Sequence, residues 1–459
     1  MSTRFHIKDI YPLSPMQEGM LFHTLLDPDS SVYLQQTSYR LRGKLDPGIV
    51  EKSLNQLFKR HDILRTAFVH EDQDQPLQVV LKDRDADFSY TDISDRSTAE
   101  EKELLITRSR EKDRLRTFDL THDPLMRVAL IRVNPAEYEF TWSHHHILMD
   151  GWCTGILISE YFEIYSSFLE ERDDRLPPAV PYSGYIKWLQ KQNKETSGSY
   201  WQTYLAHYGE SRGLPKKKVS GPGIREYKSE RVTLQLGKNE SARLARMAAS
   251  IGVTVNTIIQ SLWGIILGKY NGHRDVVFGA VVSGRPSEIP GIEQMVGLFI
   301  NTIPVRITYN AAESAAALVR RTHENAIESE PHHYYPLADI QTEHPLKQNL
   351  FDHILIFQNF PPPPRLQGDM EVSNLRMFGH TSYDFNVNID HGERLRLSIQ
   401  YNANVYPEEL ANKIADHFIT ILTRAGENID TTIEYLAELP LRNKRKEIMD
   451  QFNDDLENE

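Results

Sequence analysis

The sequence predicts an α/β protein made of two lobes of similar style. Helical and strand-like hydrophobic patterns alternate along the chain, which is typical of helices packed against sheets. The alternation stops at residues 172–181, where a charged run precedes Pro177, Pro178 and Pro181, and it starts again afterwards. The length of 459 residues suits two to four units of ordinary size. We therefore expect an N-terminal lobe over 1–175 and a C-terminal lobe over 176–440.

The first lobe opens with an amphipathic helix over 14–26, where Met16, Met20 and Leu25 recur near helical spacing before Pro28 ends the run. A strand over 138–143 alternates aromatic and polar residues and runs directly into three histidines, with a helix predicted after them. The other expected elements are helices at 50–60, 98–116 and 154–170 and strands at 78–81 and 125–133.

The second lobe repeats this style, and no short-period repeat is evident. The segment 361–364 consists of four prolines, which no helix or strand interior accepts, and 214–223 has the composition of a surface loop. The expected elements are helices at 241–250, 255–270, 311–328 and 407–425 and strands at 275–283, 299–307, 354–358, 384–389 and 395–401.

Composition excludes several classes of function. The chain has 52 Lys+Arg against 64 Asp+Glu, a net charge of −12, so it lacks the basic surface of a nucleic-acid binder. One cysteine, Cys153, allows no internal disulfide and suits a reducing compartment. Neither a secretory signal nor an apolar run of ~20 residues is present, so we expect a cytoplasmic protein with no membrane association.

The sharpest chemical motif is HHILMDGW, residues 145–152. A neutral imidazole can take a proton from an attacking amine or hydroxyl, or hydrogen-bond to a developing intermediate. An aspartate at Asp150 can orient a neighbouring histidine or form an ion pair, and Gly151 lets a substrate approach the backbone. The motif therefore marks His145 and His146 as candidates for chemistry at the end of a strand.

Other interpretations of these residues stay open. Adjacent histidines are often incidental, and a zinc site is conceivable although the spacing His-Glu-x-x-His is absent. Nucleophilic catalysis by Cys153 is another possibility, although packing is the simpler role for that thiol. The sequence contains no phosphate-binding loop, no dinucleotide fingerprint and no serine nucleophile elbow.

HHILMDGW fits the HHxxxDG signature of condensation domains of nonribosomal peptide synthetases, members of the chloramphenicol-acetyltransferase-like superfamily. Further segments resemble the family's other motifs in the expected order, over residues 11–401. They are YPLSPMQEGMLFH (11–23), RHDILRTAF (60–68), YSGYIKW (182–188), SGRP (283–286), VGLFINTIPVR (296–306), YYPLADIQ (334–341), FDHILIFQNFP (351–361) and TSYDFNV (381–387). The tail, EIMDQFND (447–454), resembles the junction to an adenylation domain, so residues 441–459 are expected to begin that linker.

The resemblance implies two chloramphenicol-acetyltransferase-like lobes, a V-shaped pseudo-dimer with an active-site tunnel at the interface. His146 is then the catalytic residue, while His145 and Asp150 are structural, with Asp150 paired to Arg285 across the lobes. Gly151 lies beside the thioester. Arg65 is a further supporting residue, Asn301 and Ser382 are candidates for the tunnel lining, and no metal is expected.

The implied reaction is peptide bond formation between a donor thioester on an upstream carrier domain and the α-amine of an acceptor on a downstream carrier domain. No cofactor is bound; the carriers deliver phosphopantetheine arms, and the adjacent partner is an adenylation domain. We expect the excised chain to be a monomer. Cys153 replaces a serine that is common in the family, and YSGYIKW and YYPLADI match less closely.

Three alternatives remain, of which the inactive recruitment module is of a different class. An epimerisation domain uses a similar histidine motif, but Trp152 after the glycine is unlike those domains. An inactive condensation-like module that recruits another enzyme usually loses the motif, which is intact here. A free-standing acyltransferase does not explain the adenylation-like tail. The sequence does not identify the donor or acceptor amino acid, the donor's stereochemistry or the product.

Overall fold

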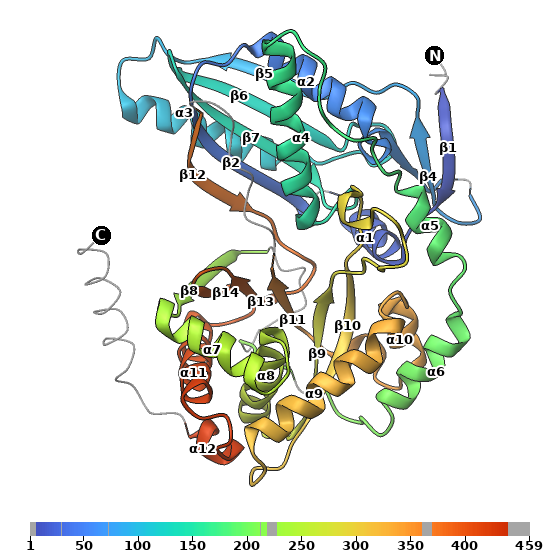
Figure 1. Ribbon diagram of the computed structural model, residues 1–459, viewed down its shortest axis with the longest axis vertical. Helices are drawn as coiled ribbons and strands as arrows, with labels where there is room; N and C mark the ends of the chain where they lie inside the picture. Colours follow the sequence, from blue (N-terminus) through green and yellow to red (C-terminus); the bar gives the residue numbers. More distant parts are fainter. Residues whose placement is uncertain are drawn as a thin grey trace. The chain divides into compact units, whose positions relative to one another are not determined.

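The computed structural model describes residues 6–28, 30–71, 73–211, 213–217, 227–359 and 370–438. The chain forms two compact α/β units, each with its own sheets, helices and hydrophobic core (Figure 1). This confirms the α/β class and the two-lobe organisation predicted from the sequence. Unit 1 comprises Met1–Asn193, Ser283–Ile300 and Phe360–Ser382, and unit 2 comprises Lys194–Val282, Asn301–Asn359 and Tyr383–Glu459.

The two units interleave along the chain, whereas the sequence-based ranges 1–175 and 176–440 are continuous. Unit 1 extends to Asn193 and takes in two later segments. Segment 283–300 packs into the core of unit 1 through Leu298 and Phe299, and segment 371–378 adds a strand to the unit 1 sheet. The predicted adenylation linker, 441–459, and the prolines at 361–364 lie outside the described residues, as does part of the loop predicted at 214–223.

Unit 1 contains a five-stranded sheet in the order β12-β2-β7-β6-β5 and a three-stranded sheet in the order β1-β4-β3. Only the β5–β6 pair of the larger sheet is parallel. Its strands are β1 (Ile7–Pro12), β2 (Leu34–Arg42), β3 (Thr66–Val69), β4 (Leu77–Leu81), β5 (Asp87–Asp92), β6 (Met126–Asn134), β7 (Glu137–His145) and β12 (Glu371–Phe378). Its helices are α1 (Pro15–Leu26), α2 (Pro47–Arg60), α3 (Ala99–Arg114), α4 (Gly151–Leu169) and α5 (Ser183–Leu189), with short 3-10 turns at Asp62–Arg65 and Ile292–Gln294.

The two faces of the five-stranded sheet differ in polarity. On one face, Phe140 of β7 packs against Tyr161 of α4, with 5.8 Å between ring centroids. On the other face, the buried Glu139 accepts hydrogen bonds from Arg40 of β2 at 3.1 Å and from Arg110 of α3 at 3.3 Å. A buried carboxylate is tolerated here because two guanidinium groups pair with it.

Helix α1 begins at a capping box, which fixes where its first turn lies. The Ser14 side chain accepts a hydrogen bond from the Gln17 N–H, and the Gln17 side chain accepts one from the Ser14 N–H. Pro15 occupies the first helical position, where no N–H is needed. The predicted helix over 14–26 is confirmed.

Unit 2 is built on one mixed six-stranded sheet in the order β10-β9-β11-β13-β14-β8. Its strands are β8 (Ser229–Gln235), β9 (Asp275–Val282), β10 (Asn301–Thr308), β11 (Ile354–Gln358), β13 (Phe385–His391) and β14 (Leu395–Asn402). Its helices are α6 (Lys194–Tyr204), α7 (Lys238–Ser250), α8 (Val255–Asn271), α9 (Ala315–Ser329), α10 (Leu337–Glu343), α11 (Glu408–Glu427) and α12 (Ile433–Ala437), with 3-10 turns at Glu330–His332 and Lys347–Leu350. Helix α8 is buried over most of its length and packs against α11 through Trp263 and Phe418.

Three differences from the predicted elements bear on the site. Helix α4 starts at Gly151 rather than at residue 154, so the motif's last residues belong to the helix. Strands β2 and β12 escaped prediction because β2 turns polar residues inward and β12 is exposed along most of its length.

Within the described residues, no single helix is long and apolar enough to cross a membrane, although the bent pair α7 and α8 together meets that criterion by length and composition.

Candidate functional site

The histidine motif occupies the connection between a central strand and a buried helix of unit 1. Strand β7 pairs with β2 and β6 and ends at His145. A tight turn follows, in which the Leu148 N–H donates to the His145 carbonyl at 3.1 Å and the Met149 N–H donates to the His146 carbonyl at 3.2 Å. Asp150 then occupies the N-cap position of α4, without a cap hydrogen bond from its side chain. The strand, turn and helix predicted from the sequence are therefore present, with His146 as the first residue beyond the strand.

His145 is a buried neutral residue whose tautomer follows from its contacts. Its Nδ1 accepts a hydrogen bond from the Ile147 N–H at 3.1 Å, so the proton resides on Nε2. That Nε2 lies 3.2 Å from Thr24 Oγ1, whose own hydroxyl donates to the Met20 carbonyl. Burial disfavours the charged imidazole and lowers the pKa of His145 from 6.5 to about 3. Both ring nitrogens of His145 are thus occupied by contacts within unit 1.

His146 differs from His144 and His145 because its side chain is half-buried while theirs are buried. Its Nδ1 lies 2.8 Å from the Met149 carbonyl oxygen, which can only accept, so Nδ1 carries the proton. The lone pair therefore resides on Nε2. Burial also lowers the pKa of His146 below 6.5, which keeps the ring neutral near pH 7. A neutral ring with an unprotonated Nε2 can accept a hydrogen bond or a proton from a substrate.

The Asp150 carboxylate holds the segment that precedes β10 against the histidine turn. Its Oδ1 lies 3.4 Å from Arg285 Nη2, and its Oδ2 accepts a hydrogen bond from the Phe299 N–H at 3.1 Å. The Asp150 N–H donates to the Gly297 carbonyl at 3.3 Å. The predicted Asp150–Arg285 pair is present, but both residues belong to unit 1, because segment 283–300 packs there. The pair therefore does not join the two units.

Arg285 is itself well supported. Its Nη1 donates to the carbonyls of Ile292 and Met295 at 2.5 and 3.0 Å, and its guanidinium lies 3.9 Å from the centroid of the Phe299 ring. Its side chain is only 6% exposed, so its partners replace most of its hydration. We conclude that Arg285 stabilises the segment that carries Phe299.

Cys153 lies on the buried side of α4. Its Sγ lies 3.4 Å from Asp150 Oδ1 and 3.2 Å from the Gly297 carbonyl, and the thiol is fully buried. Burial and the nearby Asp150 carboxylate raise the pKa of the thiol, so the nucleophilic thiolate is disfavoured. This environment favours packing over nucleophilic catalysis.

Glycine is required at one position opposite the motif. A Cβ on Gly297 would lie 2.1 Å from Cδ2 of Tyr182, whose hydroxyl donates to the Leu298 carbonyl at 2.5 Å. Gly151 is exposed at the first position of α4, where a substrate could approach the backbone.

The remaining predicted site residues lie elsewhere. Arg65 is buried, and its five N–H groups all donate, to the carbonyls of Phe58, Lys59, Leu81 and Lys82 and to Asp62. Asn301 is buried at the start of β10 in unit 2 and donates to the carbonyls of His333 and Tyr335. Ser382 is exposed in unit 1 and accepts a hydrogen bond from the Tyr33 hydroxyl at 3.1 Å. The structure thus brings His145, His146, Asp150, Gly151 and Arg285 together and places Arg65 among structural contacts.

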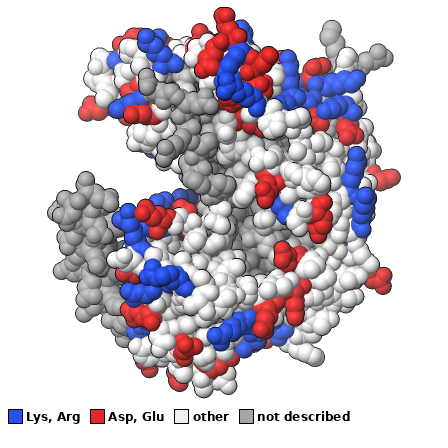
Figure 2. Space-filling model, viewed as in Figure 1, with Lys and Arg blue, Asp and Glu red and all other residues white. Residues whose placement is uncertain are grey.

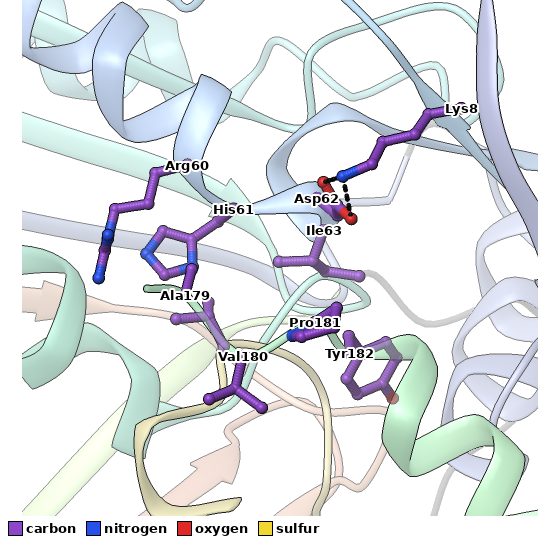
Figure 3. A pocket seen from close by; sticks show the side chains of 10 residues that line it. Lys8, Arg60, His61, Asp62, Ile63, Ala179, Val180, Pro181 and Tyr182 are labelled. Carbon is purple, nitrogen blue, oxygen red and sulfur yellow. Dashed lines mark hydrogen bonds and ion pairs between the residues drawn. The ribbon is translucent and has the colours of Figure 1, made fainter. Parts of the chain in front are cut away.

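A pocket of about 160 Å³ lies in unit 1 between the end of α2 and residues 179–182 (Figure 3). Its charged groups are already paired: Lys8 with Asp62 at 2.7 Å, and Arg60 with Glu160 at 2.9 Å. None of the site residues predicted from the sequence lines it. Among the residues the structure describes, no group of three or more His, Cys, Asp or Glu side chains is placed to hold a metal ion.

Two residues near the histidine turn received no role from the sequence. The fully buried Gln17 of α1 donates from Nε2 to the Ile147 carbonyl at 3.1 Å, and Tyr33 accepts the His146 N–H at its carbonyl at 2.8 Å. Gln17 had a readable signal, because it shares the helical face of Met20, Leu21 and Thr24. A polar residue on an otherwise apolar face points to a buried hydrogen bond. Tyr33 contributes only its backbone, which leaves no mark in the side-chain pattern.

Comparisons with known proteins agree with the resemblance. The Condensation domain family model matches residues 7–447. The chain is 42% identical to gramicidin S synthase 2 of Brevibacillus brevis, over 97% of this chain and 10% of that protein. It is 40% identical to tyrocidine synthase 2 of Brevibacillus parabrevis, over 96% of this chain and 12% of that protein. The chain therefore spans only about a tenth of the length of these curated relatives.

Solved structures match the fold over nearly the whole chain, and one of them illustrates the similarity. The starter condensation domain of rhizomide synthetase superposes with a TM-score of 0.79 at 19% identity, over 95% of this chain and 100% of that chain. At this level of identity the match supports the fold alone.

Proposed function

Since this chain belongs to the condensation domain family, we propose that it joins the acyl group of a donor thioester to the α-amine of an acceptor aminoacyl thioester. Condensation domains of nonribosomal peptide synthetases catalyse amide bond formation, an acyl transfer. His146 is the catalytic residue of this proposal. The observation that carries the assignment is the hydrogen bond from His146 Nδ1 to the Met149 carbonyl, which leaves the Nε2 lone pair available on a half-buried ring.

The chemistry needs a neutral amine beside the donor carbonyl. The amine lone pair forms the C–N bond, the tetrahedral intermediate collapses with cleavage of the C–S bond, and the proton lost by nitrogen ends on the departing sulfur. An unperturbed α-amine has a pKa near ~7.7–8.0, so part of it is already neutral at cellular pH. The chain therefore need not supply a strong base.

The lowered pKa of His146 suits a hydrogen-bond acceptor better than a strong base. Nε2 can hold the attacking amine by one N–H and accept its proton as the intermediate forms. Holding two tethered reactants in line can supply on the order of 7–11 kcal/mol of the barrier. Positioning of the amine is therefore a sufficient catalytic role for His146.

The partners follow from the family and are part of the proposal. Upstream and downstream carrier domains deliver the two thioesters on phosphopantetheine arms, and an adenylation domain adjoins the chain. The relatives are synthetases several times longer than this chain, which supports such neighbours. The single cysteine supports a cytoplasmic setting, and we propose that the excised chain is a monomer.

Carrier docking in this proposal relies on local contacts. The chain carries a net charge of −12, so bulk attraction to an acidic carrier is excluded. On the face shown in Figure 2, basic and acidic side chains are interspersed within each unit. Small basic or apolar patches are therefore the surfaces that would contact carriers.

The test is product formation by the excised chain with one donor-loaded and one acceptor-loaded carrier, followed by mass spectrometry. We expect a dipeptidyl acceptor from the wild type and none from His146→Ala, with the melting temperature of the variant unchanged. His122→Ala, which removes an exposed histidine of the same unit, is the matched control and keeps activity. Unchanged product from His146→Ala contradicts the catalytic assignment. An inverted aminoacyl group, detected by chiral chromatography of the hydrolysed thioester because its mass is unchanged, would indicate epimerisation.

A further inference from the structure

We propose that Gln17 is a positioning residue for His146. Its buried side-chain amide holds the carbonyl of Ile147, the residue after the catalytic His146, and so fixes the turn that presents Nε2. This inference rests on the proposed function, because it assigns a role relative to His146.

Gln17 is fully buried, and its hydrogen-bonding capacity is directed at defined partners. Its Nε2 donates to the Ile147 carbonyl at 3.1 Å and to Gln78 Oε1 at 3.0 Å. Its Oε1 accepts from the Ser14 N–H at 2.9 Å, as part of the capping box of α1. A single side chain thus connects the start of α1, strand β4 and the histidine turn.

The orientation of the Gln17 amide follows from its surroundings. Gln78 is also fully buried, and its Nε2 donates to the Pro12 carbonyl at 3.0 Å, so its Oε1 faces Gln17. If the Gln17 amide were flipped, its oxygen would face Gln78 Oε1 and the Ile147 carbonyl, which are both acceptors. Two buried acceptors would then lack donors, at a cost that disfavours the flipped state.

The position of the turn determines the position of the imidazole. The His146 ring is bound to the Met149 carbonyl of its own turn, so ring and turn move together. Two hydrogen bonds hold the turn from outside. The His146 N–H donates to the Tyr33 carbonyl, and the Gln17 side chain donates to the Ile147 carbonyl. Removing the Gln17 amide frees the Ile147–Leu148 peptide group and leaves the Ile147 carbonyl without this donor.

Helix α1 contacts the histidine segment a second time, two helical turns further on. Thr24 Oγ1 lies 3.2 Å from His145 Nε2. Residues 17 and 24 are seven apart and therefore lie on the same side of a helix. The helix thus supports both histidines of the motif, but only Gln17 bonds to the carbonyl of the residue that follows His146.

A role in stability alone would have different consequences. A structural hydrogen bond changes the folded fraction, whereas a positioning bond changes the rate and the environment of His146 in molecules that remain folded. The experiment therefore compares Gln17→Met, which keeps the length of the side chain and removes the amide, with Tyr138→Phe. Tyr138 donates a buried hydrogen bond to the Leu45 carbonyl near the other end of β7, roughly 20 Å from His145 along the strand.

We expect both variants to lose stability, and only Gln17→Met to lose kcat, by tenfold or more with KM within twofold. Tenfold corresponds to about 1.4 kcal/mol in the barrier. An NMR titration of His146, assigned with His146→Ala, should show its pKa rising toward 6.5 in Gln17→Met and unchanged in Tyr138→Phe. A kcat within twofold of the control together with an unchanged His146 pKa overturns the proposal.

If Gln17→Met folds poorly, a second variant tests the same proposal. Gln17→Glu keeps the size of the side chain and the oxygen facing Ser14. Its carboxyl can donate to the Ile147 carbonyl only when protonated, so kcat relative to wild type should fall as the pH rises, and a flat ratio contradicts the proposal. The NMR titration needs no catalysis, so it tests the positioning of His146 even if His146→Ala retains activity and the proposed function fails.

Discussion

Replacing Asp150 by asparagine should destabilise unit 1 by about 3 kcal/mol. Asparagine offers one acceptor oxygen where aspartate offers two, so either the Phe299 N–H or Arg285 faces an amide NH₂ group. Breaking a buried ion pair costs ~3–5 kcal/mol, and one unpaired buried donor costs ~1–3 kcal/mol. The separation of 3.4 Å between Arg285 Nη2 and Asp150 Oδ1 is long for an ion pair. We therefore take the lower end of the range.

The assay must resolve the two units. The five tryptophans divide between them, with Trp142, Trp152 and Trp188 in unit 1 and Trp201 and Trp263 in unit 2. In protein labelled with 5-fluorotryptophan, ¹⁹F NMR during a urea titration reports each unit separately. For Asp150→Asn, the urea midpoint of the unit 1 signals should be lower than in the wild type by about 1 M, given an m-value of ~2–3 kcal/mol per molar.

The matched control is Asp173→Asn, an exposed position of the same unit with the same change in charge. Its unfolding free energy should stay within ~0.5 kcal/mol of wild type. A loss below ~1 kcal/mol for Asp150→Asn would refute the view that this carboxylate holds segment 283–300 in place.

Two further predictions concern acid and the packing of Gly297. Burial lowers the pKa of His144 and His145 from 6.5 to about 3, so below pH 6.5 the unfolded chain binds more protons than the folded one. Each histidine should therefore remove about 2 kcal/mol of stability between pH 7 and pH 5, and an unchanged urea midpoint would argue against this. Gly297→Ala places a Cβ 2.1 Å from Tyr182 and should cost ~1–3 kcal/mol. Gly155→Ala in α4, with no atom within 4 Å of its Cβ, should add ~0.5–1 kcal/mol, and thermal melts in the opposite order would count against the argument.

Much of the fold could be predicted from the sequence because the local patterns agree with the tertiary structure. Ser14 and Pro15 mark the start of α1, and the strand-like pattern before His144 marks β7. Strand β2 was not predicted, because its inward side chains Gln36, Ser38 and Arg40 are buried only through polar partners from other elements. On the opposite side of β2 only Tyr39 and Leu41 are apolar and buried, which is too short an alternation to mark a strand.

The residues of the site were predictable from the sequence, whereas their arrangement in the fold was less so. The resemblance named His146, Asp150 and Arg285, and the structure joins the last two. What the sequence cannot show is that segment 283–300 belongs to the same unit as the motif, because that depends on packing between distant parts of the chain. The tautomer of His146 likewise depends on a carbonyl that only the folded turn supplies.

The interleaved course of the chain limits where this domain could be divided in a chimera. A chimera joined near residue 193 would take residues 1–193 from one parent and both later unit 1 segments from the other. Strand β2 would then pair with a foreign β12, and Asp150 would face a foreign Arg285 segment. Exchanges that keep residues 6–438 together preserve these partnerships.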